Sequence, residues 1–344
     1  MKTNIKQTTF FLVILFLIPL VQAQSLAISS LPFQIKGSTV LSDGTLFAVK
    51  GYSLLKSTNL GTTWITVASV PFSLGKAFYA TSTNNILAVS GQKYAYGKIW
   101  LSTNRGVSWL KVYGLGLNET VWNFQEYKGK VYASIYSYES PPLKVHARIL
   151  ISNDFGLTWK VLTTFVGYRH VHEVFVNAYN GWIYAAVGDA TPALMRSKDG
   201  GITWTNLHSK MLFTSINARG SMVYLGEDVY VYDKTDSTRI WRFNDMGNGI
   251  AVLEKVFDYG SRYAGNVFWM KELHGKLVFG TVPALKGWTA LIGVSNGDWS
   301  AFSIVRQETV SVGWTGFQNP TSSYWPLPLI LVKGLATSNV VISV

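Results

Sequence analysis

Residues 57–64 read STNLGTTW, and three further segments align with them without gaps: STNRGVSW at 102–109, SNDFGLTW at 152–159 and SKDGGITW at 197–204. Each segment has Ser first, Asn or Asp third, Gly fifth, Thr or Ser seventh and Trp eighth. Their first residues lie 45, 50 and 45 positions apart. A regular spacing of this length indicates a supersecondary unit that recurs once per repeat.

Each shared position of the octet suits a tight turn between two strands. The Asn or Asp side chain can accept hydrogen bonds from backbone N–H groups ahead of it, and the Ser hydroxyl can do the same. Gly supplies the positive φ of the turn, and Trp opens the next strand with a large apolar face. We therefore predict a structural role for the repeated positions. They are Ser57, Asn59, Gly61, Trp64, Ser102, Asn104, Gly106, Trp109, Ser152, Asp154, Gly156, Trp159, Ser197, Asp199, Gly201 and Trp204.

The octet resembles the Asp-box, or BNR, repeat found in sialidases and other β-propellers. Two degenerate copies follow, IWRFNDMG at 240–247 and SNGDW at 295–299. The resemblance implies an all-β, sialidase-like propeller of four-stranded blades. It also implies that the boxes lie between the third and fourth strands of each blade, on the face opposite the ligand site.

The strand pattern around the octets gives six complete units that end near Val305. The remaining chain offers three strands, Thr309–Gly313, Leu329–Val332 and Val340–Val344, and Leu26–Ser29 forms a strand outside any unit. Joining these terminal strands would complete a seventh blade and leave the ring without an exposed edge. We predict seven blades closed by N- and C-terminal strands, with six blades and a trailing tail as the alternative.

The first 23 residues are typical of a secretory signal peptide. Lysines precede an apolar run from Phe10 to Leu20, and residues 21–23, VQA, fit a cleavage site. Eleven apolar residues are fewer than the ~20 that cross a bilayer as a helix. No later stretch is long and apolar enough to span a membrane. We therefore expect one propeller domain over residues 24–344, secreted, periplasmic or held at the cell surface.

Composition excludes several classes of function. The chain has no cysteine, so disulfides, Cys–zinc sites and thiol catalysis are excluded. The formal net charge is +12, but the basic residues are scattered singly and form no basic run. With export, this pattern predicts no nucleic-acid partner. There is no phosphate-binding loop or dinucleotide fingerprint, so we expect no cofactor.

We expect a ligand site in the loops on the face opposite the boxes, because function concentrates in loops on a rigid scaffold. Residues 136–147 and 227–238 form long loops, while 168–173 (YRHVHE) and 258–263 (DYGSRY) connect blades. The predicted ligand-binding residues are Tyr138, Glu139, Tyr168, Arg169, His170, His172, Glu173, Glu227, Asp228, Arg262, Tyr263 and Trp288.

His170 and His172 are candidates for metal ligands because alternate residues of a strand project to one face. Their spacing implies no third ligand. Asp228, Asp233 and Asp236 lack the ordered spacing and central Gly of a calcium loop. The sequence therefore predicts no metal site.

The chain departs from the sialidase pattern of three arginines around a substrate carboxylate. It has no arginine before Arg105, which lies in a box, and residues 31–36, LPFQIK, lack the early arginine of the family. Other glycosidases need only two carboxylates. Glu139, Glu173, Asp189, Glu227 and Asp258 are available in candidate segments, but nothing selects a pair, so no catalytic residue is predicted.

We predict an exported, non-catalytic propeller that binds a glycan or protein ligand through its loop-bearing face. One alternative is a glycoside hydrolase, sialidase-like or other, that uses carboxylates of this face. Another is a structural surface propeller or an assembly factor, similar to the propellers that help build photosystem II. Two carboxylates ~5–10 Å apart in a central pocket would favour the hydrolase.

Overall fold

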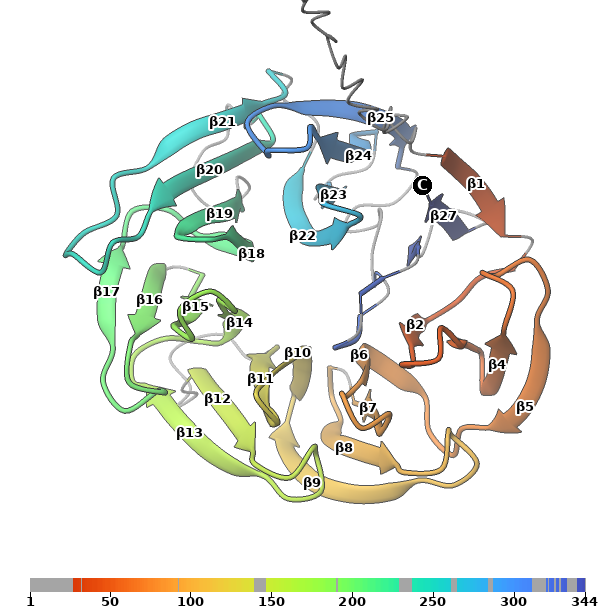
Figure 1. Ribbon diagram of the computed structural model, residues 1–344. Helices are drawn as coiled ribbons and strands as arrows, with labels where there is room; N and C mark the ends of the chain where they lie inside the picture. The colour runs from red at the N-terminus through yellow and green to blue at the C-terminus, as the bar shows by residue number, and fades with distance from the viewer. Residues whose placement is uncertain are drawn as a thin grey trace, which may run out of the picture.

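The chain forms an all-β propeller of seven blades around a central channel (Figure 1). The computed structural model describes residues 27–31, 33–91, 93–138, 147–189, 191–228, 237–260, 265–283, 287–310, 320, 322–324, 326–327, 329–332 and 339–343. The predicted signal peptide, residues 1–23, lies outside this part of the chain. Within these ranges, no helix has the length and hydropathy of a membrane span.

Six blades each contain four antiparallel strands that follow one another from the channel outward. Blade one contains β2 (Gly37–Val40), β3 (Leu46–Lys50), β4 (Ser53–Ser57) and β5 (Ile65–Ser69). Blade two contains β6 (Leu74–Ala80), β7 (Ile86–Ser90), β8 (Tyr96–Ser102) and β9 (Leu110–Leu117). Blade three contains β10 (Glu119–Tyr127), β11 (Lys130–Ser137), β12 (Ala147–Ser152) and β13 (Lys160–Phe165). Blade four contains β14 (Val171–Val176), β15 (Ile183–Val187), β16 (Ala193–Ser197) and β17 (Thr205–His208). Blade five contains β18 (Phe213–Arg219), β19 (Met222–Glu227), β20 (Arg239–Asn244) and β21 (Glu254–Asp258). Blade six contains β22 (Asn266–Leu273), β23 (Lys276–Val282), β24 (Thr289–Ser295) and β25 (Phe302–Thr309).

The seventh blade joins the two ends of the chain, as the sequence predicts. Its described strands run in the order β26 (Ile330–Val332), β27 (Asn339–Ser343) and β1 (Ala27–Leu31). β1 pairs antiparallel with β27 over its whole length. The strand expected at residues 309–313 is not among them, because Thr309 ends β25 and residues 311–313 lie outside the described part. The prediction of seven blades is confirmed and the six-bladed alternative is wrong.

The four octets form the turns between the third and fourth strands of blades one to four. In blade two, the Ser102 hydroxyl accepts the Gly106 N–H at 2.8 Å, and Asn104 Oδ1 accepts the Ser108 N–H at 2.9 Å. The Trp109 indole N–H donates to the Gly106 carbonyl at 3.1 Å. The corresponding bonds recur in the other three octets. Each turn is therefore held by its own side chains.

Box glycines also pack against the preceding blade. Gly156 has φ +94°, and a Cβ there would lie 2.6 Å from Leu87 of blade two. A Cβ at Gly106 would likewise collide with Leu54 of blade one. Glycine is required at these positions both by the turn conformation and by the close approach of neighbouring blades.

The hydrophobic core is divided among the interfaces between neighbouring blades. The described residues contain one buried cluster for each of the seven interfaces, including the closing one between blades seven and one. There, Leu331 of β26 packs with Val40 and Leu46 of blade one. The ring is thus held by apolar sheet-to-sheet packing as well as by the strand pairing of β1.

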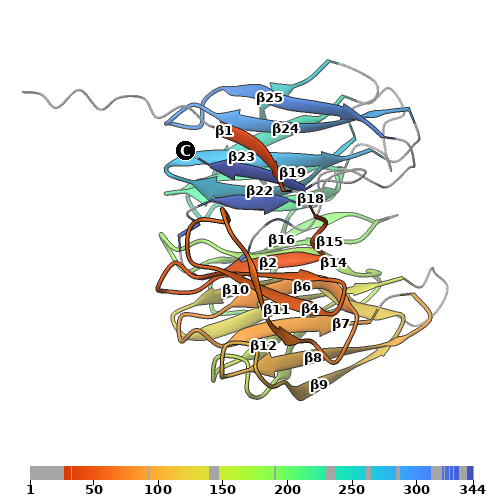
Figure 2. The same cartoon turned by 90° about the vertical axis from the view of Figure 1, so that its right-hand side faces the viewer.

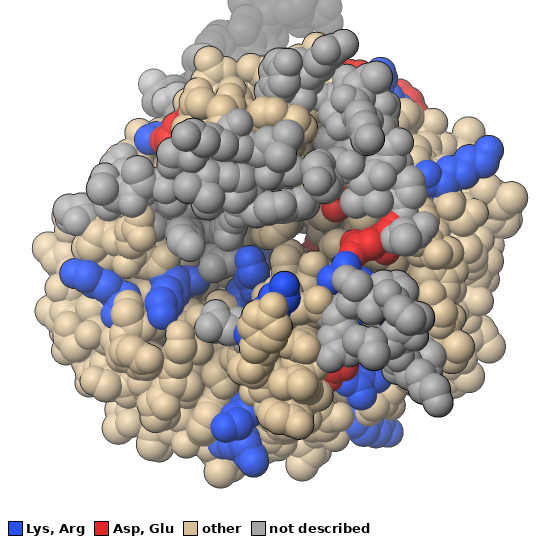
Figure 3. Space-filling model, turned by 180° about the vertical axis from the view of Figure 1, so that it is seen from behind, with Lys and Arg blue, Asp and Glu red and all other residues tan. Residues whose placement is uncertain are grey.

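Strand direction separates two faces of the propeller. The box turns and the turns from first to second strands lie on one face, because successive antiparallel strands reverse direction (Figure 2). The connections between second and third strands, and those between blades, lie on the other face. This second face is the loop-bearing face, viewed directly in Figure 3.

Candidate functional site

The innermost strands of five blades are irregular at one level of the channel. The pairing of each innermost strand with its neighbour shifts register there, which marks a β-bulge in β6, β10, β14, β18 and β22. Bulges redirect side chains and are frequent next to functional sites. The residues at these shifts, which we call the bulge ring, include Lys76, Trp122, Asn123, His172, Thr214 and Phe268.

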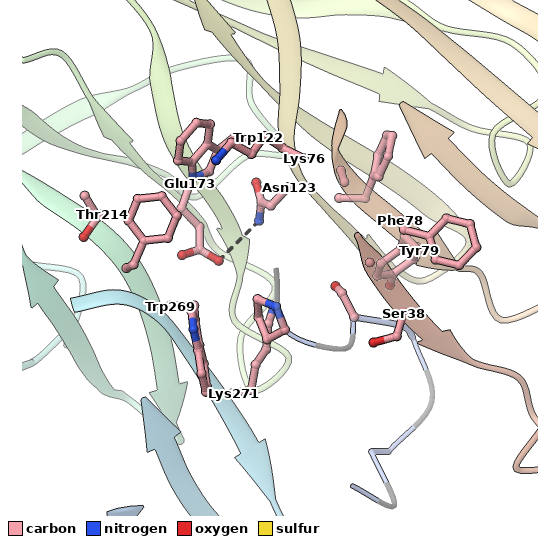
Figure 4. Close-up of a pocket in the computed structure, with 16 residues that line it drawn as sticks. Ser38, Lys76, Phe78, Tyr79, Trp122, Asn123, Glu173, Thr214, Trp269 and Lys271 are labelled. Carbon is pink, nitrogen blue, oxygen red and sulfur yellow. Dashed lines mark hydrogen bonds between the residues drawn. The ribbon is translucent and has the colours of Figure 1, made fainter. Parts of the chain in front are cut away.

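Most of the bulge ring lines a small pocket in the channel (Figure 4). Its volume is about 70 Å³. The pocket is formed mainly by the first halves of the innermost strands, which enter from the loop-bearing face. Its lining residues are Gly37, Ser38, Lys76, Ala77, Phe78, Tyr79, Trp122, Asn123, Phe124, Glu173, Thr214, Phe268, Trp269, Lys271, Pro320 and Ser322.

A second cavity continues the channel toward the box face. It has a volume of about 840 Å³ and is lined by the second halves of the innermost strands and by their turns. Glu173, Asn123 and Lys271 line both spaces and so lie where they meet. A segment from the C-terminal part of the chain also borders both, because the Ser322 carbonyl accepts the Thr39 hydroxyl and the Tyr324 N–H donates to the Ala80 carbonyl.

Glu173 is the carboxyl group of the small pocket. The Asn123 amide donates to its Oε1 at 3.2 Å, and the Ile216 backbone N–H donates to its Oε2 at 3.0 Å (Figure 4). Burial raises the pKa of Glu173 to about 7, although the positive charge of Lys271 acts in the opposite direction. The raised pKa brings the titration of this carboxyl toward neutral pH, so the charge of the pocket changes with pH in this range.

Another part of the pocket lining combines aromatic rings with a lysine. Lys76 Nζ lies 4.9 Å from the centre of the Trp122 ring and 5.6 Å from that of Phe268. The two rings meet edge to face, with their centres 5.2 Å apart. This geometry supports a cation–π interaction that orients the ammonium group. Lys271 of β22 also lines the pocket. Among the described lining residues, there are therefore two lysines and one carboxyl group.

A stack of rings leads from Trp122 away from the channel. Trp122 stacks on Tyr136 with a centre-to-centre distance of 4.3 Å, and Tyr136 stacks on the His170 imidazole at 3.9 Å. Tyr138 meets Tyr136 edge to face at 5.1 Å. Burial, followed by the charge of Asp189, raises the pKa of Tyr136 above its ordinary value. Tyr136 is thus a neutral ring that connects the pocket wall to the histidines.

His170 and His172 converge on Asp189, which follows β15. The Nε2 atoms of the two imidazoles lie 3.0 Å apart, and each lies 3.0 Å from Asp189 Oδ1. Arg169 Nη1 donates to the other carboxylate oxygen, Oδ2, at 2.7 Å. Burial and the neighbouring His172 lower the pKa of His170 to about 4. Burial alone would raise the pKa of Asp189, but hydrogen bonds with the two imidazoles lower it below its ordinary range.

The structure brings four of the predicted ligand-binding residues together around Tyr136 and Asp189, namely Tyr138, Arg169, His170 and His172, while a fifth, Glu173, lines the small pocket. Tyr168 lies beside them, but its side chain packs against the core between blades three and four. The sequence alone did not place Glu173 in the channel, where the bulge at His172 directs it.

The other predicted residues lie elsewhere or outside the described part. Glu227 is buried and accepts the Trp241 indole N–H at 2.6 Å, so it holds blade five together. Asp228 is buried next to it, close enough to contribute to the raised pKa of Tyr136. Trp288 packs against the core between blades six and seven. Glu139, Arg262 and Tyr263 lie outside the described residues.

Several residues of the site were not predicted from the sequence. Lys76, Trp122, Asn123 and Lys271 lie on innermost strands, whereas the predicted ligand site lies in loops and in the connections between blades. The signal available for them is polar residues placed among the apolar residues of innermost strands, such as Asn123 between Trp122 and Phe124 and Lys271 after Trp269 and Met270. Asp189 was noted only as an available carboxylate, and its place beside the histidines was not foreseen.

Comparison with known proteins identifies the fold. No protein-family model matches the chain, and no curated protein sequence matches it. Among solved structures, the chain is similar to YCF48 bound to D1 peptide, with 12% identity, a TM-score of 0.56, and coverage of 93% of this chain and 97% of that one. It is also similar to the GH74 xyloglucanase from Xanthomonas campestris, with 13% identity, a TM-score of 0.59 and coverage of 91% of this chain. The chain spans about half of the xyloglucanase, 53% of its length. These similarities support the propeller fold, and the relation to the Asp-box family remains a resemblance.

Proposed function

We propose that this protein is an exported, non-catalytic propeller that binds a polypeptide ligand through its loop-bearing face and accepts an acidic group of that ligand in the small pocket. The observation that carries the proposal is the pairing of Lys76 and Lys271 with aromatic walls around a pocket that has one carboxyl group among its described lining residues.

The small pocket by itself suits a small group better than a sugar ring, whereas the adjoining cavity of about 840 Å³ has room for a sugar. A volume of about 70 Å³ corresponds to roughly two water molecules at ~30 Å³ each. Pockets that enclose whole small molecules are usually larger, ~300–1,000 Å³. An Asp or Glu side chain, or a terminal carboxylate, presents a group of suitable size while the rest of the polypeptide lies on the loops. The similarity to YCF48, whose structure contains a bound D1 peptide, is compatible with this mode of binding.

The charges of the pocket favour a carboxylate. Lys76 is oriented by two rings, and Lys271 lies close enough to Glu173 to influence its pKa. When Glu173 is protonated, the described lining residues carry the two positive charges of these lysines and no negative charge. A bound carboxylate would supply a negative charge through charge-assisted hydrogen bonds.

The arrangement of carboxylates does not favour a hydrolase. A glycosidase of the usual kind needs two carboxyl groups that flank the scissile bond. Of the described candidates, Glu227 bonds to Trp241, Asp189 pairs with Arg169, and Asp258 pairs with Lys255. None of these three lines the small pocket. Within the described lining of the small pocket, Glu173 therefore lacks a second carboxylate, whereas Glu126 and Glu272 line the larger cavity with it.

Binding can be tested on a peptide array that presents matched pairs of Asp and Asn, Glu and Gln, and free and amidated C-termini. A glycan array and a panel of fluorogenic glycosides would be run in parallel. We expect binding to the acidic member of a pair and no hydrolysis. Lys76→Met and Lys271→Met should each weaken binding about 10-fold or more, because a hydrogen bond to a charged group contributes ~1.5–3 kcal/mol.

The matched control is Lys111→Met, since Lys111 is exposed on the outermost strand of blade two. This variant should bind like the wild type. Equal binding of acidic and amide peptides would contradict the proposal, as would exclusive binding of glycans. Turnover of a glycoside that Glu173→Gln abolishes would instead establish the hydrolase.

A further inference from the structure

Four oxygen and nitrogen atoms converge where β14 begins and β15 ends. They are Nε2 of His170, Nε2 of His172, Oδ1 of Asp189 and the carbonyl oxygen of Gly188. The first three form a triangle with sides of 3.0 Å, and the Gly188 oxygen lies 2.9 Å from His172 Nε2. Both imidazoles are buried, and the Asp189 side chain is 23% exposed.

The four converging atoms have too few N–H groups among them to form hydrogen bonds with one another. His170 Nδ1 lies 3.0 Å from the Ser137 carbonyl oxygen, so the neutral ring carries its proton there and turns the lone pair of Nε2 toward Asp189. The carboxylate and the Gly188 carbonyl are acceptors only. His172 is then the one residue of the four that can supply a proton, and its Nδ1 has no hydrogen-bond partner. Three acceptor atoms would have to share a single N–H.

We propose that His170, His172 and Asp189 bind a divalent transition-metal ion of the zinc class. Two imidazole nitrogens and one carboxylate oxygen are a donor set that zinc accepts, with a fourth position left for water or another oxygen. A cation would satisfy the converging lone pairs together, which one proton cannot do.

The spacing of the three atoms fits such an ion. In a triangle with sides of 3.0 Å, each atom lies ~1.7 Å from the centre, so an ion with bonds of ~2.1 Å would stand ~1.2 Å out of the plane. An ideal tetrahedral zinc site separates its ligand atoms by ~3.4 Å. The cluster therefore needs to open by only a few tenths of an ångström.

Neighbouring groups hold the ligands as they do in metal sites. The Ser137 carbonyl fixes the tautomer of His170, and Arg169 holds Asp189 through Oδ2, which leaves Oδ1 for the ion. Ser137 belongs to blade three, whereas the three ligands belong to blade four. A bound ion would thus hold the start of β14 and the end of β15 together and keep them next to blade three.

Zinc binding can be measured on the folded chain without a histidine tag, after treatment with a chelator and its removal. Titration with ZnCl₂ in a calorimeter should saturate at one ion per chain and raise the melting temperature. Asp189→Asn and His172→Gln should each weaken zinc binding by at least ~10-fold. His274→Asn is the matched control, because His274 is exposed in a turn of blade six with φ +49°, which Asn tolerates, and this variant should bind like the wild type.

Circular dichroism of each variant establishes that it is folded before its affinity is compared. The wild type alone gives an independent measurement, because bound Co²⁺ should produce the visible absorption of a site with nitrogen and oxygen ligands. The proposal is overturned if the wild type shows no saturable site, or if both folded ligand variants bind zinc as tightly as the wild type. If neither ligand variant folds, the absence of a Co²⁺ absorption band in the wild type would overturn it.

Discussion

Replacing Glu173 by Gln changes the charge of the pocket with little change in shape. In the wild type, the pKa of Glu173 is raised from its ordinary 4.5 to about 7 by burial. Between these two values, the folded protein keeps a proton that the unfolded chain has released. The contribution of Glu173 to the free energy of unfolding therefore falls as pH rises through this window, and it stays lower above it.

The size of this effect follows from the change in pKa. Each tenfold change in the ionisation constant corresponds to 1.36 kcal/mol, so a rise from 4.5 to about 7 costs about 3 kcal/mol once the group is ionised. Gln carries no charge at any pH and has nearly the shape of the protonated carboxyl. The NH2 group of Gln and the O–H group of the protonated acid each face a hydrogen-bond donor, either the Asn123 amide or the Ile216 N–H, so this unfavourable contact is common to both. Glu173→Gln should thus match the wild type at pH 4.5 and be about 3 kcal/mol more stable at about pH 8.

Urea denaturation of both proteins across this pH range measures the difference directly. Glu272→Gln is the matched control, because Glu272 is exposed on β22, and its difference from the wild type should not follow the same curve. A Glu173→Gln difference that stays flat between pH 4.5 and about pH 8 would refute the assignment of a buried carboxyl with a raised pKa. A Glu173→Gln variant that is less stable at high pH would show that the ionised form is stabilised in the channel.

Three further substitutions test the scaffold that carries the site. Gly156→Ala should destabilise the protein by about 2–4 kcal/mol through its positive φ and its collision with a leucine of β7, whereas Gly167→Ala, with φ +85° and open space around it, should cost only about 1–2 kcal/mol in urea denaturation. Asp245→Asn should cost about 3–5 kcal/mol because it leaves the buried Arg196 guanidinium without its charged partner, and the double variant with Arg196→Met should cost less than the sum of the two single variants. Trp109→Phe removes the indole N–H bond of its box and should cost about 1 kcal/mol or more, with equal stability of variant and wild type counting against a structural role for the box tryptophan.

The parts of the fold predicted from the sequence are those that depend on local interactions. The bonds of a box connect residues three to four positions apart, such as Ser102 with Gly106, so the octet itself contains the information for its turn. Closure of the ring could also be predicted, because strands left over at the two ends have no other partner. The order of strands in the seventh blade, with β1 beyond β27, depends on packing that the sequence pattern does not contain.

The candidate site was predicted only in part because its residues come from different blades. The segment at 168–173 is recognisable in the sequence. Lys76, Trp122 and Lys271, however, belong to three different blades and come together only when the ring closes. Bulges in the innermost strands then direct side chains such as Lys76 and Trp122 into the channel. Asp189 could have been placed from the sequence. The Asn180-Gly181 turn sets a register in which Val174 pairs with Ala185, and continuing this register along both strands brings Asp189, which follows β15, close to His170.

The proposed peptide pocket and the proposed metal site are joined by packed rings. Tyr136 stacks on His170 and on Trp122, and the Lys76 ammonium group lies 4.9 Å from the centre of the Trp122 ring. Close-packed rings have little space in which to move, so an ion that shifts the imidazole also constrains the wall that orients Lys76. By thermodynamic linkage, any factor by which zinc changes the affinity for the acidic ligand must equal the factor by which that ligand changes the affinity for zinc. The stack of Trp122, Tyr136 and His170 is therefore a direct packing contact between the two proposed sites.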